Sequence, residues 1–179
     1  RDAQLRLAGH GRIEWTAGGE DYVKQYFPPS LVDMSYPASN LVAEMDYIGV
    51  EKAVLHNSPH LGLLNGYLRD AVKRFPDRLT RLIAVRYASL PGDVDAAIAE
   101  LEGEVEAGGY CGLQFFTRYY YDDGATEPWD DGVMRPFWQA AAAMKIPVYF
   151  TVQTPAGTRY SMEESEGYLE QQRILIRWM

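Results

Sequence analysis

Several side chains that could bind or transform a small molecule occur near the ends of short apolar segments. Histidine can serve as an acid, a base or a ligand, and arginine grips a carboxylate through two parallel hydrogen bonds. Amide and hydroxyl groups can fix the orientation of a polar substrate. The side chains in question are His56, Asn57, Arg86, Gln114, Thr151 and Gln153. They can form one site only if the fold brings the ends of the apolar segments together.

The apolar segments predict strands, and the segments between them predict helices. Strands are expected at residues 50–55, 82–87, 110–116 and 146–153. Apolar residues at helical spacing predict helices near residues 41–48, 64–75, 94–105 and 133–144, with a further one from about residue 168. The first three helices end at Gly49, Pro76 and Gly108. Strands that alternate with helices indicate parallel pairing through right-handed crossovers.

Two architectures share this alternation, an open doubly wound sheet and a (β/α)8 barrel. No glycine-rich phosphate loop follows any of the expected strands, which disfavours a nucleotide-binding sheet. A complete barrel needs about 250 residues, whereas four strand–helix repeats fill this chain of 179 residues. The sequence therefore predicts an α/β fold of the (β/α)8 TIM-barrel type, with only about half of the barrel represented.

The N-terminal residues follow a different pattern from the rest of the chain. Two short strand-like segments flank Ala17, Gly18 and Gly19, which is a hairpin signal, and Pro28 and Pro29 end this region. We expect an N-terminal hairpin or arm over residues 1–36 and a partial (β/α) barrel over residues 37–179.

Alternation along each strand decides which side chains face the barrel interior. The face toward the helices should be apolar, so Arg86, Gln114, Thr151 and Gln153 should point inward. The first strand is ambiguous, and either of the two polar residues after it, at 56 and 57, could face the interior. Active sites of such barrels lie at the C-terminal ends of the strands, so these side chains should converge there.

Residue types suggest roles for the members of this site. His56 is the candidate catalytic residue, and His60 is a weaker one because it lies deeper in the loop. Arg86 suits an anionic group, and Tyr119, the first of three consecutive tyrosines, could line a pocket for a planar substrate. With Gln114, Thr151, Gln153 and Asn57, these two residues make up the expected substrate-binding set.

Composition narrows the classes of partner. The net charge of −8 and the pI of about 4.9 disfavour a nucleic-acid surface. No apolar run approaches the roughly 20 residues that a membrane helix needs, and the single cysteine favours a cytoplasmic location. We therefore expect a cytoplasmic protein that takes a small-molecule substrate, binds neither nucleic acid nor membrane, and forms a homo-oligomer.

Four segments together resemble the amidohydrolase-related family. They are MDYIGVEKAVLHNSP from residue 45, LNGYLRDAVKRFPDRL from residue 64, GYCGLQFF from residue 109 and FWQAAAAMKIPVYF from residue 137. These enzymes are metal-dependent (β/α)8 hydrolases and decarboxylases of the aminocarboxymuconate-semialdehyde decarboxylase type. The resemblance covers roughly residues 38–179 and implies a hydrolase or nonoxidative decarboxylase of a small carboxylated compound, with aromatic compounds among the candidates.

The resemblance also implies a divalent metal, Zn or Mn, at the mouth of the barrel. The family holds it with an H-x-H or E-x-H pair after the first strand, a His after a middle strand and an Asp after the last. Nothing in residues 1–36 matches the pair, and Thr151 stands where the middle His would be expected. The metal ligands therefore remain unidentified in this chain, and Thr151 could hydrogen-bond substrate instead.

Two other interpretations remain open at this point. A degenerate barrel could bind a small ligand or a partner without metal chemistry, and Thr151 is the main support for it. A complete doubly wound sheet could act as a small-molecule binding domain, in which case residues 1–179 would fold alone.

Overall fold

The computed structural model describes residues 6–57, 63–85, 92–117, 128–151, 169 and 172–177 of the 179-residue chain. Internal contacts divide the chain into two units, Arg1–Glu51 and Lys52–Met179. Helix α1 groups with the N-terminal unit in this division, and the boundary after residue 36 stays a prediction.

The N-terminal unit contains a small antiparallel sheet and one helix. Its strands are β1 (Arg6–Ala8), β2 (Arg12–Ala17) and β3 (Glu20–Gln25), in the order β1-β2-β3. Gly18 and Gly19 join β2 to β3 with φ angles of 61° and 82°, so the predicted hairpin is present, and β1 adds a third strand. Helix α1 (Ala38–Ile48) ends where predicted, at Gly49 with φ 77°.

The second unit is a parallel sheet with helices in the connections. Its elements in chain order are β4 (Ala53–Leu55), α2 (Asn65–Arg74), β5 (Leu79–Ile83), α3 (Val94–Ala107), β6 (Tyr110–Phe116), the 3-10 helix η3 (Gly132–Met134), α5 (Arg135–Ala143) and β7 (Val148–Thr151). Residues 172–177 are also helical, within the helix expected from about residue 168.

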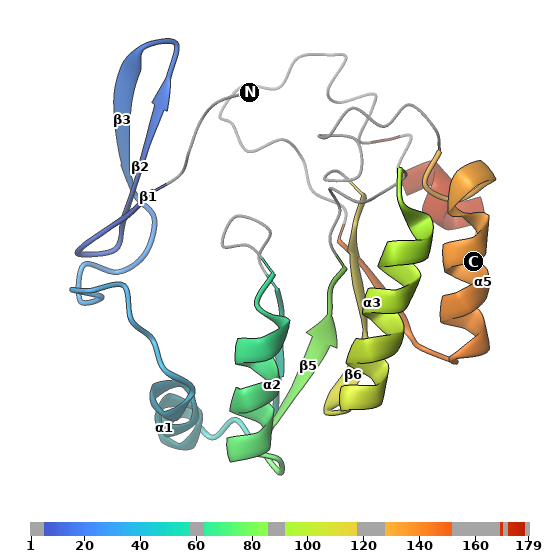
Figure 1. The fold of residues 1–179 in the computed structure, drawn as a ribbon. Coiled ribbons are helices and arrows are strands. Elements are labelled where there is room, and N and C mark those ends of the chain that lie inside the picture. The colour runs from blue at the N-terminus through green and yellow to red at the C-terminus, as the bar shows by residue number, and fades with distance from the viewer. Residues whose placement is uncertain are drawn as a thin grey trace. The chain divides into compact units, whose positions relative to one another are not determined.

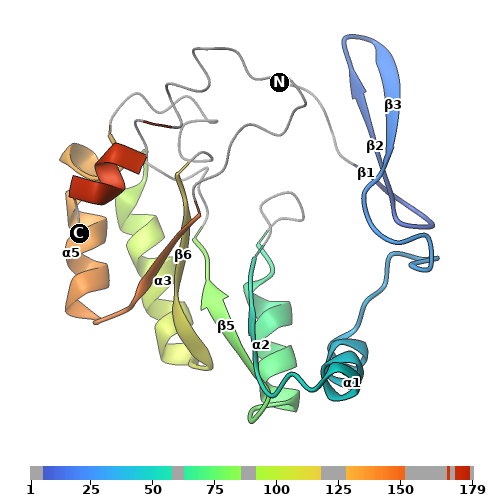
Figure 2. The same ribbon diagram turned by 180° about the vertical axis from the view of Figure 1, so that it is seen from behind.

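The strand order of this unit decides between the two predicted architectures. The four strands lie in the sequential order β4-β5-β6-β7, and every neighbouring pair is parallel. Figures 1 and 2 show α2, α3 and α5 along the same face of the sheet. A doubly wound sheet reverses its strand order and carries helices on both faces. The doubly wound interpretation is therefore wrong for this unit, and the arrangement is that of consecutive barrel repeats.

Three strands begin elsewhere than the sequence predicted, and one of them is β7, which begins at Val148 instead of residue 146. The first strand begins at Ala53, because the backbone N–H of Val50 donates to Met45 O and so belongs to the end of α1. Strand β5 covers residues 79–83 instead of 82–87, since Leu79 follows directly on the turn after α2. Strand β6 has the predicted bounds.

The core lies between the sheet and the helices. The ring of Phe115 contacts the rings of Trp129, Trp138 and Phe150, with centroids 4.9–6.1 Å apart. Ile83 and Leu113 are fully buried in the same cluster. These strand residues are ones that alternation assigned to the helix side, so the opposite face carries the inward positions, Gln114 and Thr151 among them.

Candidate active-site rim

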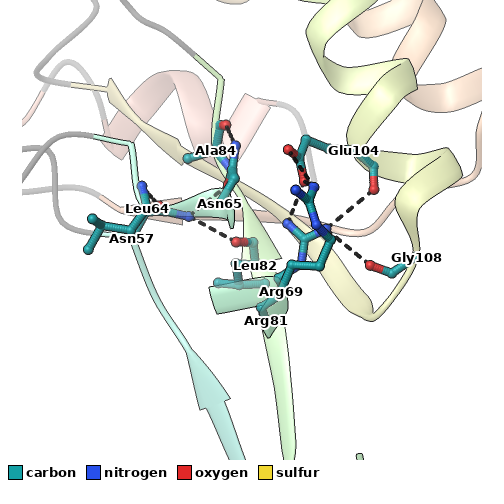
Figure 3. Close-up of polar contacts among 9 residues, drawn as sticks. All are labelled: Asn57, Leu64, Asn65, Arg69, Arg81, Leu82, Ala84, Glu104 and Gly108. Atoms are coloured by element: carbon teal, nitrogen blue, oxygen red, sulfur yellow. Dashed lines mark hydrogen bonds and ion pairs between the residues drawn. The ribbon is translucent and has the colours of Figure 1, made fainter. Parts of the chain in front are cut away.

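Asn57 is the centre of a buried polar network where β4 ends. Its side chain is almost completely buried, at 4% exposure. Its backbone N–H donates to Gln114 Oε1 at 2.9 Å, and its Nδ2 donates to Leu82 O at 3.0 Å. Its Oδ1 accepts the backbone N–H of Leu64 at 2.9 Å (Figure 3). The side chain of Asn57 thus connects the end of β4 with β5 and the start of α2, and its backbone N–H adds the link to β6.

Asn65, the first residue of α2, completes this network on the side of β5. Its Nδ2 donates to Ala84 O at 2.7 Å, and its Oδ1 accepts the backbone N–H of Ala84 at 3.2 Å. The same Oδ1 accepts Asn57 Nδ2 at 3.2 Å. Because an asparagine at the start of a helix usually serves as a capping group, its sequence position gave no sign of this contact.

Gln114 carries the network across the sheet to β7. Its Nε2 lies 3.5 Å from Thr151 Oγ1, the long end of a hydrogen bond. Because Oε1 accepts from Asn57, the amide must present its N–H groups on the side of Thr151. Gln114 is 2% exposed, whereas Thr151 is half-buried. The structure thus brings together three predicted site residues, Asn57, Gln114 and Thr151.

Of the two residues that could follow the first strand into the interior, Asn57 is the buried one, and this does not decide which of them takes part in the chemistry. Asn57 joins the network, and the side chain of His56 is exposed. The catalytic role of His56 therefore stays a prediction. Arg86, Tyr119 and Gln153, together with the weaker candidate His60, lie outside the described residues.

A second polar cluster, which was not predicted from the sequence, lies on the helix side of the sheet. Arg81 is fully buried, with Nη1 2.8 Å from Glu104 Oε2 and Nη2 3.0 Å from Gly108 O. Arg69 also contacts the Glu104 carboxylate, at 3.2 Å (Figure 3). This cluster ties α2, β5 and the end of α3 together. An arginine in a helix-facing position of an apolar strand is the signal that could have indicated a carboxylate partner on a neighbouring helix.

The described part of the rim does not by itself fit a metal centre. Among the residues that the structure describes, no three His, Cys, Asp or Glu side chains lie close enough together to hold a metal ion. The amide oxygens of Asn57, Asn65 and Gln114 already accept hydrogen bonds. A threonine hydroxyl such as that of Thr151 is a poor Zn ligand beside histidine or carboxylate. The rim is built instead to orient hydrogen-bond donors.

One hollow among the described residues lies away from this rim. It has a volume of about 590 Å³ and lies beside α5 and β7, lined by residues that include Trp138, Ile146 and Val148. Val148 packs against the core on the helix side. This hollow therefore opens on the face opposite to Gln114 and does not serve the candidate site.

Comparison with protein families identifies the chain. The family model described as amidohydrolase matches residues 16–164. The chain belongs to the amidohydrolase family. A comparison with curated proteins gave no match. Within the described residues of this family member, no helix is long and apolar enough to cross a membrane.

Solved structures show which fold the family member shares. One is 5-carboxyvanillate decarboxylase from Novosphingobium aromaticivorans, with manganese and 4-hydroxy-3-methoxy-5-nitrobenzoic acid: 22% identity, TM-score 0.55, covering 77% of this chain and 40% of that one. Another is 2,6-dihydroxybenzoate decarboxylase from Rhizobium: 21% identity, TM-score 0.54, covering 78% and 46%. The amidohydrolase-family chain spans less than half the length of either structure. Its parallel sheet is part of a TIM barrel, as predicted.

Proposed function

We propose that the protein containing this chain is an enzyme that decarboxylates or hydrolyses a small carboxylated aromatic compound. The observation that carries the proposal is the hydrogen-bonded row of Asn57, Gln114 and Thr151 across the ends of β4, β6 and β7. Membership of the amidohydrolase family supports it, since TIM-barrel enzymes place their chemistry at this edge of the sheet.

The substrate-binding roles follow from the chemistry of the donors. Gln114 Nε2 points its N–H groups toward Thr151, and the Thr151 hydroxyl can donate its own proton to an oxygen of the substrate. The Arg86 guanidinium matches a carboxylate in geometry and charge. Tyr119 and Gln153 would line the remainder of the pocket, and Asn57 would form its floor.

A decarboxylation would consume one proton, which replaces the carboxylate on the ring. The bond between the ring carbon and the carboxyl carbon breaks, carbon dioxide leaves, and the ring carbon takes up the electron pair and then a proton. His56 is exposed after β4 and is the candidate donor of that proton. For a hydrolase, the same histidine would take a proton from the attacking water.

A divalent ion, Zn or Mn, is part of the proposal on family likeness alone. The manganese-bound neighbour supports it, while the described residues of the rim offer no ligand set. The ion's ligands would therefore belong to other parts of the protein. A homo-oligomeric state and a cytoplasmic location are likewise proposals.

A turnover assay on the full-length protein tests this function. We expect loss of 5-carboxyvanillate or 2,6-dihydroxybenzoate in the presence of Mn²⁺ or Zn²⁺, and we expect Arg86→Ala to raise KM or lower kcat. Arg74→Ala is the matched control, because Arg74 is an exposed residue at the end of α2. Unchanged affinity and turnover in Arg86→Ala would remove the proposed role of that residue.

A metal-free binding protein is the second candidate. It is favoured by Thr151 and by the neighbouring amides, whose oxygens already accept hydrogen bonds. Metal analysis of the full-length protein separates the two. Nearly one Zn or Mn ion per chain supports the enzyme. A protein that holds no metal, and whose activity does not rise on adding metal, supports the binding protein.

A further inference from the structure

Two asparagine side chains occupy the place of a strand beside the end of β5. Strand β4 pairs with β5 only as far as the register Leu55↔Arg81. Beyond that register, Asn57 Nδ2 donates a hydrogen bond to the carbonyl of Leu82. The Asn65 amide donates through Nδ2 to the carbonyl of Ala84 and accepts the Ala84 N–H at Oδ1. A side-chain amide carries one acceptor and a pair of donor hydrogens, so it can pair with a peptide group as a neighbouring strand would.

The burial of this pairing makes it costly to lose. Asn57 and Asn65 are 4% and 6% exposed. Any donor or acceptor left without a partner here would forgo both its hydrogen bond and its hydration. The two amides therefore fix the position of the backbone at Ala84, just after β5 ends.

The same amides are connected to the far side of the rim. Asn65 Oδ1 accepts from Asn57 Nδ2 at 3.2 Å, and Asn57 N–H donates to Gln114 Oε1 at 2.9 Å. Gln114 in turn points its N–H groups toward Thr151. Two hydrogen bonds thus connect the Asn65 amide to Gln114, so a displacement of that amide would also move the N–H groups that Gln114 presents at the rim.

We propose that Asn65 is a positioning residue, whose amide clamps the ends of β4 and β5 and so sets the orientation of Gln114 and Thr151. Asn65 touches no reacting atom in this proposal. Its kinetic consequence rests on the proposed function, whereas the clamp itself can be tested without any substrate.

The test uses Asn65→Asp in the full-length protein, with amide hydrogen exchange resolved to single residues. The introduced carboxylate keeps an acceptor for the Ala84 N–H but turns a second oxygen toward Ala84 O, where Asn65 Nδ2 donates at 2.7 Å. Burial at this position should raise the pKa of the introduced carboxyl above that of a free aspartic acid, and its protonation restores a donor there. After correction for the intrinsic exchange rate, we expect protection at Ala84 and Asn57 to be about tenfold lower at pH 8 than at pH 5.

Two controls separate this effect from general loosening. Asn40→Asp makes the same chemical change at an exposed asparagine of α1 and should leave both amides as in the wild type. The amide of Leu113, which donates to Pro147 O at 2.8 Å between β6 and β7, should keep its protection in Asn65→Asp. Protection at Ala84 that does not depend on pH would overturn the clamp. Loss at Ala84 with normal protection at Asn57 would overturn the link to the rim.

Kinetics then judge the positioning role. For a substrate that the wild type turns over, we expect kcat of Asn65→Asp to fall about tenfold at pH 8 and to recover as the pH is lowered, relative to the wild type at each pH. Wild-type kcat and KM together with an exposed Ala84 amide would overturn positioning. If the wild type turns over neither test substrate, the proposed function fails, and hydrogen exchange still decides the clamp.

Discussion

The backbone N–H of Asn57 donates to the side-chain oxygen of Gln114 at 2.9 Å, between residues 57 positions apart in the chain. Asn57 follows β4 and Gln114 belongs to β6, so the bond spans the strand that lies between them, β5. A side chain of β6 thereby holds the backbone at the end of β4.

Replacement of Gln114 by leucine should lower the free energy of unfolding and should also loosen the hydrogen-bonded contacts at the rim. Gln114→Leu leaves the buried N–H of Asn57 without its acceptor, which costs about 1–3 kcal/mol in the free energy of unfolding. Gln139→Leu makes the same change at an exposed position of α5 and should cost less than about 0.5 kcal/mol. Urea denaturation of both variants measures the difference, and equal midpoints would contradict the assigned contact.

Gly112 should not tolerate a methyl group. A Cβ there would lie 2.8 Å from Pro147 O and 2.9 Å from two ring carbons of Tyr149. Pro147 O also accepts the N–H of Leu113, so it cannot retreat without loosening β7. We expect Gly112→Ala to lower the free energy of unfolding by about 1–3 kcal/mol.

At Gly103, the same substitution by alanine should change the free energy of unfolding in the opposite direction. Gly103 lies within α3, and a Cβ there would meet nothing within 4 Å. Gly103→Ala should therefore stabilise the protein by about 0.5–1 kcal/mol, because alanine is the better helix former. Thermal unfolding of the two variants side by side measures both signs, and a stabilised Gly112→Ala would show that β6 and β7 are farther apart than described.

The buried arginine should depend strongly on its carboxylate. Glu104→Gln leaves the fully buried Arg81 without a counter-charge and should cost about 3 kcal/mol. Arg81→Met should cost less, since Glu104 keeps Arg69, and Arg81 Nε has no hydrogen-bond partner among the described residues. Chemical denaturation ranks the two variants. The reverse ranking would mean that packing of the arginine stem outweighs its charge.

The parts of the fold that local sequence controls were predictable. Gly49 ends α1 as predicted, and the alternation that put Leu113 and Phe115 toward the helices left Gln114 on the other face, as the contacts bear out. Strand ends were harder, because Val50 is apolar yet hydrogen-bonds back into α1. Apolar character alone does not show which partner a backbone N–H will take.

The site was only partly predictable, because its contacts join residues distant in sequence. Gln114 was expected at the rim from its place in a strand, and Asn57 was one of two alternatives after the first strand. Asn65 was not, since its bonds to Ala84 cross 19 positions and depend on how α2 packs on β5. The pairing of Arg81 with Glu104 crosses 23 positions and depends in the same way on α3.

The central claim is that the Gln114–Thr151 row binds a small carboxylated aromatic compound. Its most direct test is the dissociation constant of 4-hydroxy-3-methoxy-5-nitrobenzoic acid for the full-length protein with Mn²⁺, followed by the absorbance of the nitrophenol. We predict saturable binding that Thr151→Val weakens about tenfold, the effect of one lost hydrogen bond to a charged group. Thr16→Val, at an exposed position of β2, should leave the constant unchanged. Absence of binding to the wild type, or equal constants for the wild type and Thr151→Val, would contradict the claim.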